Sequence, residues 1–443
     1  MSRRSLCIVV LFLLGACVPD PADEPRRRVT GPNILVIITD DQRATSTLEE
    51  MPQTRRWLSR SGIRFTNAYA TTPLCCPSRA SIYTGRYAHN HGVETNLSPD
   101  VHRLDHSSTL QRYLQEAGYR TAIVGKFLNR WPIAEAPPYF DSWSIFTTGV
   151  PYFRGTWNVE GEVSEITTYS TTYIGDRATD FLRQAETDDD RPWFLNLATA
   201  APHQPSIPEH RYADLAVPSF DVSPSVGEKD RSDKPPYVRS GRVPLSVVRK
   251  VRREQIRSLP SVDDMIGRVR SELEALGEED TLTIFLSDNG MMWGEHGLHG
   301  KTAPYVDSVK IPMLLNWPGH VAPGIDERLV ANIDVAPTVL DAVGITTEPA
   351  VDGRSLLDGR RRRSLLLEYW DMFRYETPTW AALLSEKKEY IEYYNERGAT
   401  TFVEYYDLAA DPWQLKNAGA GKALDGWSRR LVKARTCKGA SCP

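Results

Sequence analysis

Acidic residues follow two apolar runs of the chain, and they are the first groups that could do chemistry. Asp40 and Asp41 follow the run NILVIIT, and Asp288 and Asn289 follow the run LTIFLS. Adjacent carboxylates repel each other unless a cation lies between them, so we prefer a cation site to the alternative of solvated turns. Carboxylate and amide oxygens, with no His or Cys pairs at zinc spacing, favour a hard cation. Calcium accepts this set more readily than magnesium, but either ion fits.

A cysteine motif is the second reactive group, within the stretch TTPLCCPSRASIYTGRYAHNH. Proline suits the first turn of a helix, so the sequence predicts a helix from Pro77 to Thr84 that ends at Gly85. Cys75 and Cys76 then lie at the positive end of this helix, where backbone N–H groups favour an anion. Arg79 follows Cys75 by about one turn, so its guanidinium can reach the same position. The alternative is a pair of buried cysteines before an amphipathic helix.

Strands and helices that alternate along the chain must position these residues. The run Asn33–Thr39 is apolar throughout, as expected of a strand buried on both faces. Further strands are expected at Ile63–Tyr69, Arg120–Val124, Trp193–Thr199, Leu282–Ser287 and Ile311–Trp317, and helices at Gln53–Arg60, Thr109–Ala117, Tyr173–Ala185, Leu245–Leu276 and Asp334–Val343. This alternation predicts an α/β fold with a mostly parallel, doubly wound sheet. Such sheets place their sites at the carboxyl ends of the strands.

Two segments depart from this alternation. Asn129–Tyr173 is rich in aromatic residues, and we expect it to pass over the site. Its prominent aromatic residues are Trp131, Tyr139, Trp143, Tyr152 and Trp157. Their flat faces suit either sugar rings or packing within the loop, and the sequence does not decide between the two. After about Arg360, short strand-like pieces predict a small antiparallel sheet, at Ser364–Trp370, Ala381–Ser385, Glu389–Tyr394 and Phe402–Asp407, with a helix at Lys422–Ala434.

The composition is that of a globular protein. The 443 residues are 41% hydrophobic and 25% charged, enough for one large domain and a small one. The 53 Lys and Arg residues are offset by 57 Asp and Glu residues, so no basic field favours nucleic acid. Six cysteines are too few for a disulfide scaffold. Cys437 and Cys442 close a short terminal loop, either as a disulfide in an oxidising compartment or as two free thiols.

The N-terminus predicts export. Two arginines precede the apolar run Leu6–Leu14, which is a secretory signal too short to span a bilayer as a mature helix. The letters LGAC, which end at Cys17, resemble a bacterial lipobox, in which the cysteine is acylated and becomes the new N-terminus. We therefore expect a cell-surface or periplasmic lipoprotein that contacts the membrane only through its lipid anchor. The alternative is an ordinary cleaved signal with an accidental cysteine. Residues 18–31 read as a flexible tether.

The motif Cys75-Cys76-Pro77-Ser78-Arg79, with Thr84-Gly85-Arg86 behind it, resembles the signature of the type I sulfatases. In that family the first cysteine is oxidised to formylglycine by a formylglycine-generating enzyme. The hydrated aldehyde is the nucleophile. The resemblance extends from Asn33 to Tyr406-Asp407-Leu408 and Asp411-Pro412. It implies calcium and an alkaline-phosphatase-like fold. With the N-terminal signal and the change of pattern after Arg360, we expect a signal peptide at 1–17, a catalytic domain at 32–360 and a C-terminal subdomain at 361–443.

The family pattern also implies roles for separate residues. It has an Arg in the signature, a Gly-Lys after a strand, a Pro-His after another strand, and a Lys shortly after Asp-Asn-Gly. The catalytic residues implied are Cys75, Arg79, Lys126, His203 and Lys301, and the metal ligands are Asp40, Asp41, Cys75, Asp288 and Asn289. In this scheme the metal and Arg79 activate a hydroxyl of residue 75, which attacks sulfur. Lys126 and Lys301 hold the sulfate oxygens, and His203, or Lys301, protonates the leaving alcohol.

One departure from the family pattern concerns the breakdown step. Many members have Gly-Lys-Trp-His, but here the run is GKFLN, so Leu128 replaces the histidine. Asn129, His89 and His91 are candidates for its role in removing a proton. The run GKFLN, with LCCPSR and HNH, is similar to the N-acetylglucosamine-6-sulfatase branch. We therefore expect hydrolysis of 6-O-sulfate from N-acetylglucosamine or a related sulfated glycan.

Two other functions stay open. A phosphate or phosphonate monoester hydrolase on the same fold would favour a second metal site, which we cannot assemble from this sequence. A surface lipoprotein that binds sulfated glycans without turnover would keep an unmodified Cys75.

Overall fold

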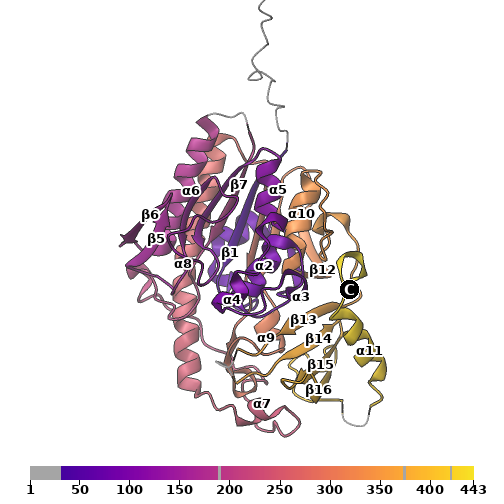
Figure 1. The fold of residues 1–443 in the computed structure, drawn as a ribbon. Coiled ribbons are helices and arrows are strands. Elements are labelled where there is room, and N and C mark those ends of the chain that lie inside the picture. Colours follow the sequence, from indigo (N-terminus) through magenta and orange to yellow (C-terminus); the bar gives the residue numbers. More distant parts are fainter. Residues whose placement is uncertain (1–30, 188–190, 373–375, 420–421) are drawn as a thin grey trace, which may run out of the picture.

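A ten-stranded sheet forms the centre of the protein, in the order β12–β2–β11–β8–β1–β7–β3–β4–β5–β6 (Figure 1). The computed structural model describes residues 31–187, 191–372, 376–419 and 422–443. The strands are β1 (Asn33–Thr39), β2 (Ile63–Tyr69), β3 (Arg120–Lys126), β4 (Ser142–Phe146), β5 (Gly155–Val159), β6 (Glu162–Ile166), β7 (Trp193–Ala198), β8 (Thr281–Ser287), β11 (Met313–Asn316) and β12 (Gly324–Ala331). Strands β8, β1, β7, β3 and β4 are parallel, whereas β11 and β5 are antiparallel to both of their neighbours.

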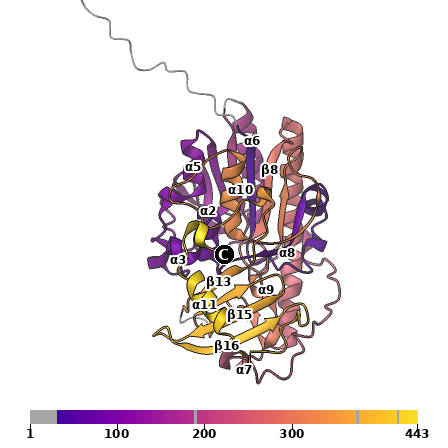
Figure 2. The same ribbon diagram turned by 90° about the vertical axis from the view of Figure 1, so that its right-hand side faces the viewer.

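Helices cover both faces of the sheet (Figures 1 and 2). One face carries α2 (Cys75–Thr84), α5 (Leu110–Glu116) and α10 (Val335–Ala342), and the other carries α6 (Ser170–Thr187) and α8 (Leu245–Leu276). The sequence of the central strand β1 is apolar throughout because both of its faces are buried. Ile34, Val36 and Ile38 join the core under α2, whereas Leu35 and Ile37 join the core under α8. Each such side chain contributes about 1.5–3 kcal/mol when fully buried.

Short elements connect these layers. They are α1 (Pro52–Thr54), which continues as a π-helical turn at Arg55–Ser59, then α3 (Ala88–His91), α4 (Ser98–Val101), α7 (Pro236–Ser240), the hairpin of β9 (Met292–Trp293) and β10 (His299–Gly300), and α9 (Val306–Val309). Helix α2 begins at Cys75, two residues before the predicted start, and it ends at Gly85 as expected. Gly85 adopts the left-handed conformation (φ 66°) that closes many helices.

A second, four-stranded antiparallel sheet lies beyond one end of the large sheet (Figure 2). Its strands are β13 (Leu365–Tyr369), β14 (Trp380–Leu384), β15 (Lys388–Tyr394) and β16 (Thr400–Asp407), and α11 (Asp425–Ala434) packs against it. Cys437 and Cys442 form a disulfide. The predicted fold class, a mostly parallel sheet flanked by helices with a small antiparallel sheet, is confirmed.

The aromatic segment between β3 and α6 corrects one expectation. It was expected to be a long excursion over the site, but much of it forms β4, β5 and β6, which extend one edge of the large sheet. Trp131, Tyr152 and Trp157 are buried. The ring of Trp157 packs edge-on against Phe146, with centroids 4.9 Å apart. For Trp131, Tyr152 and Trp157 the alternative of packing is therefore confirmed, whereas Tyr139 and Trp143 are half-buried.

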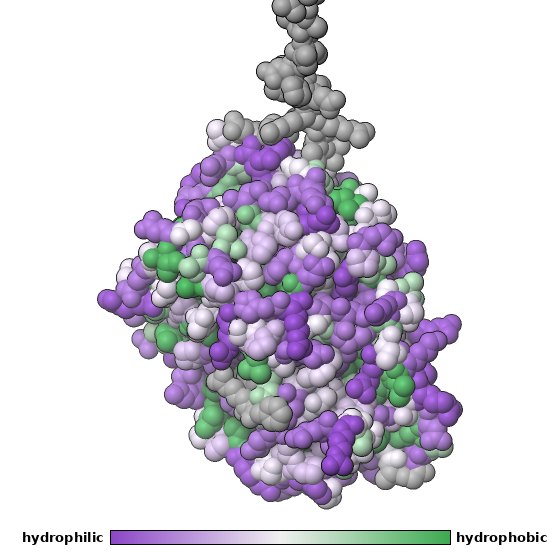
Figure 3. All heavy atoms as spheres, viewed as in Figure 1, coloured by the Kyte–Doolittle hydropathy of each residue, from purple (hydrophilic) through white to green (hydrophobic). Residues whose placement is uncertain are grey.

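The predicted signal, lipobox and tether lie almost entirely on residues 1–30, outside the described part of the chain. Among the described helices, none is both long enough and apolar enough to cross a membrane. The face seen in Figure 3 is mostly hydrophilic, with hydrophobic side chains scattered over it.

Candidate active site

The acidic pairs come together because the strands that precede them are neighbours. Strands β1 and β8 are parallel and adjacent, so they end side by side. The backbone N–H of Asp41 donates to Asp288 Oδ1 (3.1 Å), and Asn289 Nδ2 donates to Asp41 Oδ1 (2.7 Å). Asp40, Asp41, Asp288 and Asn289 are all at most 3% exposed. The four side chains predicted as oxygen ligands therefore lie together at the carboxyl edge of the sheet.

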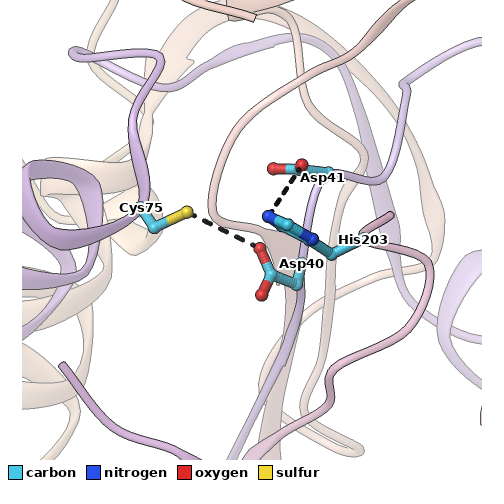
Figure 4. Close-up of side chains that lie close together, drawn as sticks. All are labelled: Asp40, Asp41, Cys75 and His203. Carbon is cyan, nitrogen blue, oxygen red and sulfur yellow. Dashed lines mark hydrogen bonds and ion pairs between the residues drawn. The ribbon is translucent and has the colours of Figure 1, made fainter. Parts of the chain in front are cut away.

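Helix α2 brings Cys75 to this cluster from the neighbouring layer. Its sulfur lies 3.8 Å from Asp40 Oδ1, and Figure 4 shows it pointing toward the paired aspartates. Cys76 lies against another element: its sulfur accepts the backbone N–H of Asn129 (3.1 Å). Burial raises the pKa of the Cys76 thiol to about 12. The two adjacent cysteines thus have different surroundings, and only Cys75 faces the carboxylates.

Two buried cations lie beside the carboxylates. Arg79 donates from Nε to Asp288 Oδ2 (3.0 Å) and from Nη1 to the carbonyl oxygen of Lys126 (3.0 Å). Its Nη2 is buried and has no hydrogen-bond partner among the described residues. The ammonium of Lys126 pairs with Asp40 Oδ2. Nη2 of Arg79 lies 3.9 Å from Asp40 Oδ2, within ion-pair distance but without a hydrogen bond, so it can still donate to a bound oxyanion.

Lys301 completes the positive side of the cluster. Its ammonium contacts Asp41 Oδ1, Cys75 Sγ (2.9 Å) and Asn289 Oδ1 (3.3 Å). Burial would raise the pKa of the Cys75 thiol, but Lys126 and Lys301 outweigh burial, so this pKa lies below its ordinary value. The position between these ligand atoms already accommodates one cationic group.

The donor set therefore fits a divalent cation, with one difference from the predicted ligands. Four side chains have ligand atoms within 4.8 Å of one another: Asp40, Asp41, Cys75 and His203. Asp288 stands beside this group, but its two oxygens accept hydrogen bonds from the Asp41 backbone and from Arg79. The ligand roles of Asp288 and Asn289 stay predictions.

His203 enters the site from the loop after β7. Its Nδ1 lies 2.5 Å from the carbonyl oxygen of Gln204, and a carbonyl only accepts, so Nδ1 carries a proton and donates. Nε2 then faces the site, 3.5 Å from Asp41 Oδ2 (Figure 4). Burial would lower the pKa of His203, but the carboxylates of Asp41 and Asp40 outweigh burial and raise it to about 9. The two carboxylates thus favour the protonated form of His203, which is the form that can serve as an acid.

The candidates for the missing histidine have other partners. Leu128 is fully buried in the core. His89 pairs with Glu368 (2.9 Å), and His91 Nε2 lies 3.0 Å from the hydroxyl oxygen of Ser81. Asn129 contacts Cys76 through its backbone. The role of the missing histidine is thus left without an assigned residue.

Sequence reasoning gave no role to two residues that support the site. The Ser78 hydroxyl donates to the carbonyl oxygen of Asp288 and accepts from Asn332 Nδ2 (2.8 Å), which ties α2 to the end of β8. Tyr152, for which the sequence left sugar contact and packing open, also supports the site: its hydroxyl donates to the carbonyl oxygen of His203 (2.6 Å). Ser78 lies within the cysteine motif, but Asn332 is 254 residues away, so no local signal links the two.

Two family models match this chain. Residues 32–345 match the sulfatase model, and residues 294–434 match the model described as N-sulphoglucosamine sulphohydrolase, C-terminal. The chain belongs to the sulfatase family. Members of this family are sulfuric ester hydrolases, so the resemblance seen in the cysteine motif is confirmed.

Curated relatives in the sulfatase family cover this chain to different extents. It is 34% identical to the extracellular sulfatase SULF-1 homolog of Drosophila melanogaster, over 76% of this chain but 32% of that protein. It is 28% identical to human N-acetylglucosamine-6-sulfatase, over 98% of this chain and 89% of that protein. It is 25% identical to the N-acetylglucosamine-6-O-sulfatase of Bacteroides thetaiotaomicron, over 91% of this chain and 85% of that protein. The chain thus spans about a third of the Drosophila protein.

Solved structures share the fold of this sulfatase family member. The structure of BT4656 in complex with its substrate D-glucosamine-2-N,6-O-disulfate superposes with a TM-score of 0.79 at 23% identity, over 91% of this chain and 96% of that one. The phosphonate monoester hydrolase of Agrobacterium radiobacter superposes with a TM-score of 0.68 at 22% identity, over 90% of this chain and 95% of that one. The fold alone therefore does not decide which ester is cleaved.

Proposed function

We propose that this protein hydrolyses sulfate monoesters of a sulfated glycan, with Cys75 converted to formylglycine. The position of Cys75 carries the proposal. Its side chain lies between the carboxylate of Asp40 and the ammonium of Lys301, at the positive end of α2. The neighbouring Cys76 has none of these contacts. A reactive group at position 75 thus meets both a cation site and donors for an anion.

Different residues of the site would carry out different parts of the reaction. The hydrated aldehyde of formylglycine supplies the attacking hydroxyl, and a divalent ion supplies Lewis acidity when bound. Lys126, Lys301 and the Nη2 of Arg79 hold the sulfate oxygens as negative charge develops. The protonated Nε2 of His203 gives its proton to the leaving alcohol. Calcium is the ion we propose, because it accepts a set of protein oxygen ligands more readily than magnesium, which prefers to keep its waters.

The phosphonate hydrolase alternative finds less support. It favours a second metal site with further Asp and His ligands. Within the described residues, one group of metal-binding side chains converges, and it is the group around Cys75. A protein that only binds glycans would not need the cysteine motif, but the fold does not distinguish it from an enzyme.

The substrate we propose is a 6-O-sulfate on N-acetylglucosamine or a related sugar. Support comes from the relatives with this activity in their names, which match the chain nearly end to end. Leu128 and the His89-Asn90-His91 run agree with that branch. The aromatic segment gives no support, because Trp131 and Trp157 are buried. Export and an anchor at Cys17 remain part of the proposal, as does maturation by a formylglycine-generating enzyme.

Two measurements test this function. Mass spectrometry of the tryptic peptide that contains Cys75 distinguishes an aldehyde from a thiol, and an unmodified thiol in active protein would overturn the mechanism. The second measurement is kcat/KM for N-acetylglucosamine-6-sulfate, galactose-6-sulfate, choline sulfate and an aryl sulfate. We expect N-acetylglucosamine-6-sulfate to be the best substrate. Faster turnover of choline sulfate than of every sugar would refute the glycan assignment but not the sulfatase assignment.

A further inference from the structure

A cavity on the protein is lined by none of the residues of the catalytic cluster. It has a volume of about 410 Å³ and is lined by the loop after β1, by residues 219–223, by parts of α8, β9 and α9, and by Trp413. No proposed catalytic residue or metal ligand lines it. Its volume lies within the usual range for ligand pockets, about 300–1,000 Å³, and a bare sulfate ion would fill only a small part of it.

An unpaired cation lines this cavity. Arg252 on α8 is 7% exposed, and its Nη1 donates to the carbonyl oxygen of Pro218 (2.8 Å). Its Nε is buried without a hydrogen-bond partner, and the described residues place no carboxylate within ion-pair distance of its guanidinium. The neighbouring Arg43, by contrast, pairs with Glu295 (2.6 Å) and Asp307 (2.8 Å). A buried charge without a close counter-ion is costly, so the guanidinium of Arg252 favours an anion at its end of the cavity.

Aromatic rings surround the same guanidinium. Its carbon lies 5.2 Å from the ring centroid of Phe220 and 5.7 Å from that of Trp293. These rings hold Arg252 in place and partly replace its lost hydration. Trp413 keeps 41% of its surface exposed, and Asp221, which also lines the cavity, is exposed. A flat indole face and a carboxylate that accepts hydroxyl hydrogens suit a sugar ring.

We propose that this cavity binds an acidic sugar unit, a pyranose that carries a carboxylate or a sulfate group. The anionic group pairs with Arg252, and the ring lies against Trp413. The site is a binding site, and it goes beyond the proposed hydrolysis because the two share no residue. For a polymeric substrate, it would hold a unit other than the one being hydrolysed.

Calorimetry on the full chain with Cys75→Ala tests the proposal without turnover. The probes are glucuronic acid, N-acetylglucosamine-6-sulfate, neutral N-acetylglucosamine and sodium sulfate. Arg252→Gln should weaken glucuronic acid binding roughly 10- to 100-fold, as expected for a lost charge-assisted hydrogen bond. It should also lower the binding stoichiometry of the sulfated sugar by one. The matched control is Arg253→Gln, which removes the same charge from the exposed next residue and should leave binding unchanged.

A second variant keeps the proposal testable if the Arg252 variant does not fold. Trp413→Ala removes an exposed side chain and keeps the guanidinium, so it should weaken both acidic sugars and leave sodium sulfate unaffected. Equal losses from the Arg252 and Arg253 variants would overturn the proposal, as would no binding of either acidic sugar. Sulfate binding as tight as that of glucuronic acid would refute a sugar site. In the protein that keeps Cys75, Arg252→Gln should leave kcat/KM for a small aryl sulfate unchanged. If this protein is inactive with and without the Arg252 substitution, that result counts against the proposed hydrolysis and not against the sugar-binding site.

Discussion

The ammonium of Lys301 lies 2.9 Å from the sulfur of Cys75 and also contacts the carboxylate of Asp41. Burial would lower the pKa of Lys301, but Asp41 and Cys75 outweigh burial and hold it well above its ordinary value. Lys301 is therefore a fixed positive charge beside the position of the proposed nucleophile. It links the cation site to the place where the transferred sulfate must lie.

Replacing Lys301 should damage the chemical step. We expect Lys301→Met to lower kcat for an aryl sulfate by about 10²- to 10³-fold, the usual cost of removing one preorganised electrostatic contact. The matched control is Lys388→Met, which changes an exposed lysine on β15 and should leave kcat unchanged. Near wild-type kcat in a folded Lys301→Met protein, as judged by circular dichroism, would remove Lys301 from the mechanism.

The two cysteines should respond differently to mutation. Cys75→Ala should abolish turnover, because it removes the residue that becomes formylglycine. Cys76→Ala should keep most activity and lower the melting temperature, since it deletes a buried sulfur that accepts the Asn129 N–H. Rates and thermal unfolding of both variants test this. Loss of activity in the Cys76 variant alone would reverse the assignment.

Metal removal should abolish activity reversibly. Exhaustive treatment with a chelator should remove turnover, and added calcium should restore it. Asp288→Asn should lower the affinity for the metal and the activity together. Asparagine is chosen because it keeps the size of the aspartate, which also pairs with Arg79 (3.0 Å). Deleting the whole side chain would leave a buried, unpaired guanidinium, which costs about 3–5 kcal/mol. Full activity after chelation would argue against the metal site.

The sequence predicted the site better than its surroundings. Asp40 and Asp41 meet Cys75 and Arg79 as expected, because the first pair follows a strong strand signal and the second pair lies on a strong helix signal. Lys301 had no such signal, and only the family pattern placed it in the site. Residues 129–173 were misplaced because aromatic side chains suit a core as well as a sugar site. Ser78 and Asn332 were missed since their contact spans 254 residues. Local patterns place residues on elements, whereas contacts between distant loops need the fold.

Stability should fall at acid pH through His91. Burial, and to a smaller extent the nearby His89 and Arg86, lower the pKa of His91 to about 3. Its Nδ1 accepts the N–H of Val93 (3.1 Å), so the native state holds it neutral. The unfolded chain protonates it below about pH 6.5, so its contribution is fully present above that pH and is lost progressively as the pH falls toward 3.

The predicted slope is about 1.4 kcal/mol of unfolding free energy per pH unit from this group. Urea unfolding of the wild type and His91→Gln at several values between pH 7.5 and 4.5 measures it. The variant should be less stable at pH 7.5 and should lose less stability on acidification. Parallel curves for the two proteins would show that His91 does not titrate in this way.

The leaving group should decide how much His203 matters. An alkoxide leaves less readily than a phenoxide, so a sugar sulfate depends on proton donation more than an aryl sulfate does. His203→Ala should lower kcat/KM for N-acetylglucosamine-6-sulfate by about 10²- to 10⁴-fold, the usual contribution of general acid catalysis, and affect the aryl sulfate much less. His299→Ala is the control: this ring contacts the Gln204 side chain (3.2 Å) beside His203 and should not separate the two substrates. Equal losses on both substrates in the His203 variant would mean that His203 binds sulfate or metal and does not protonate the alcohol.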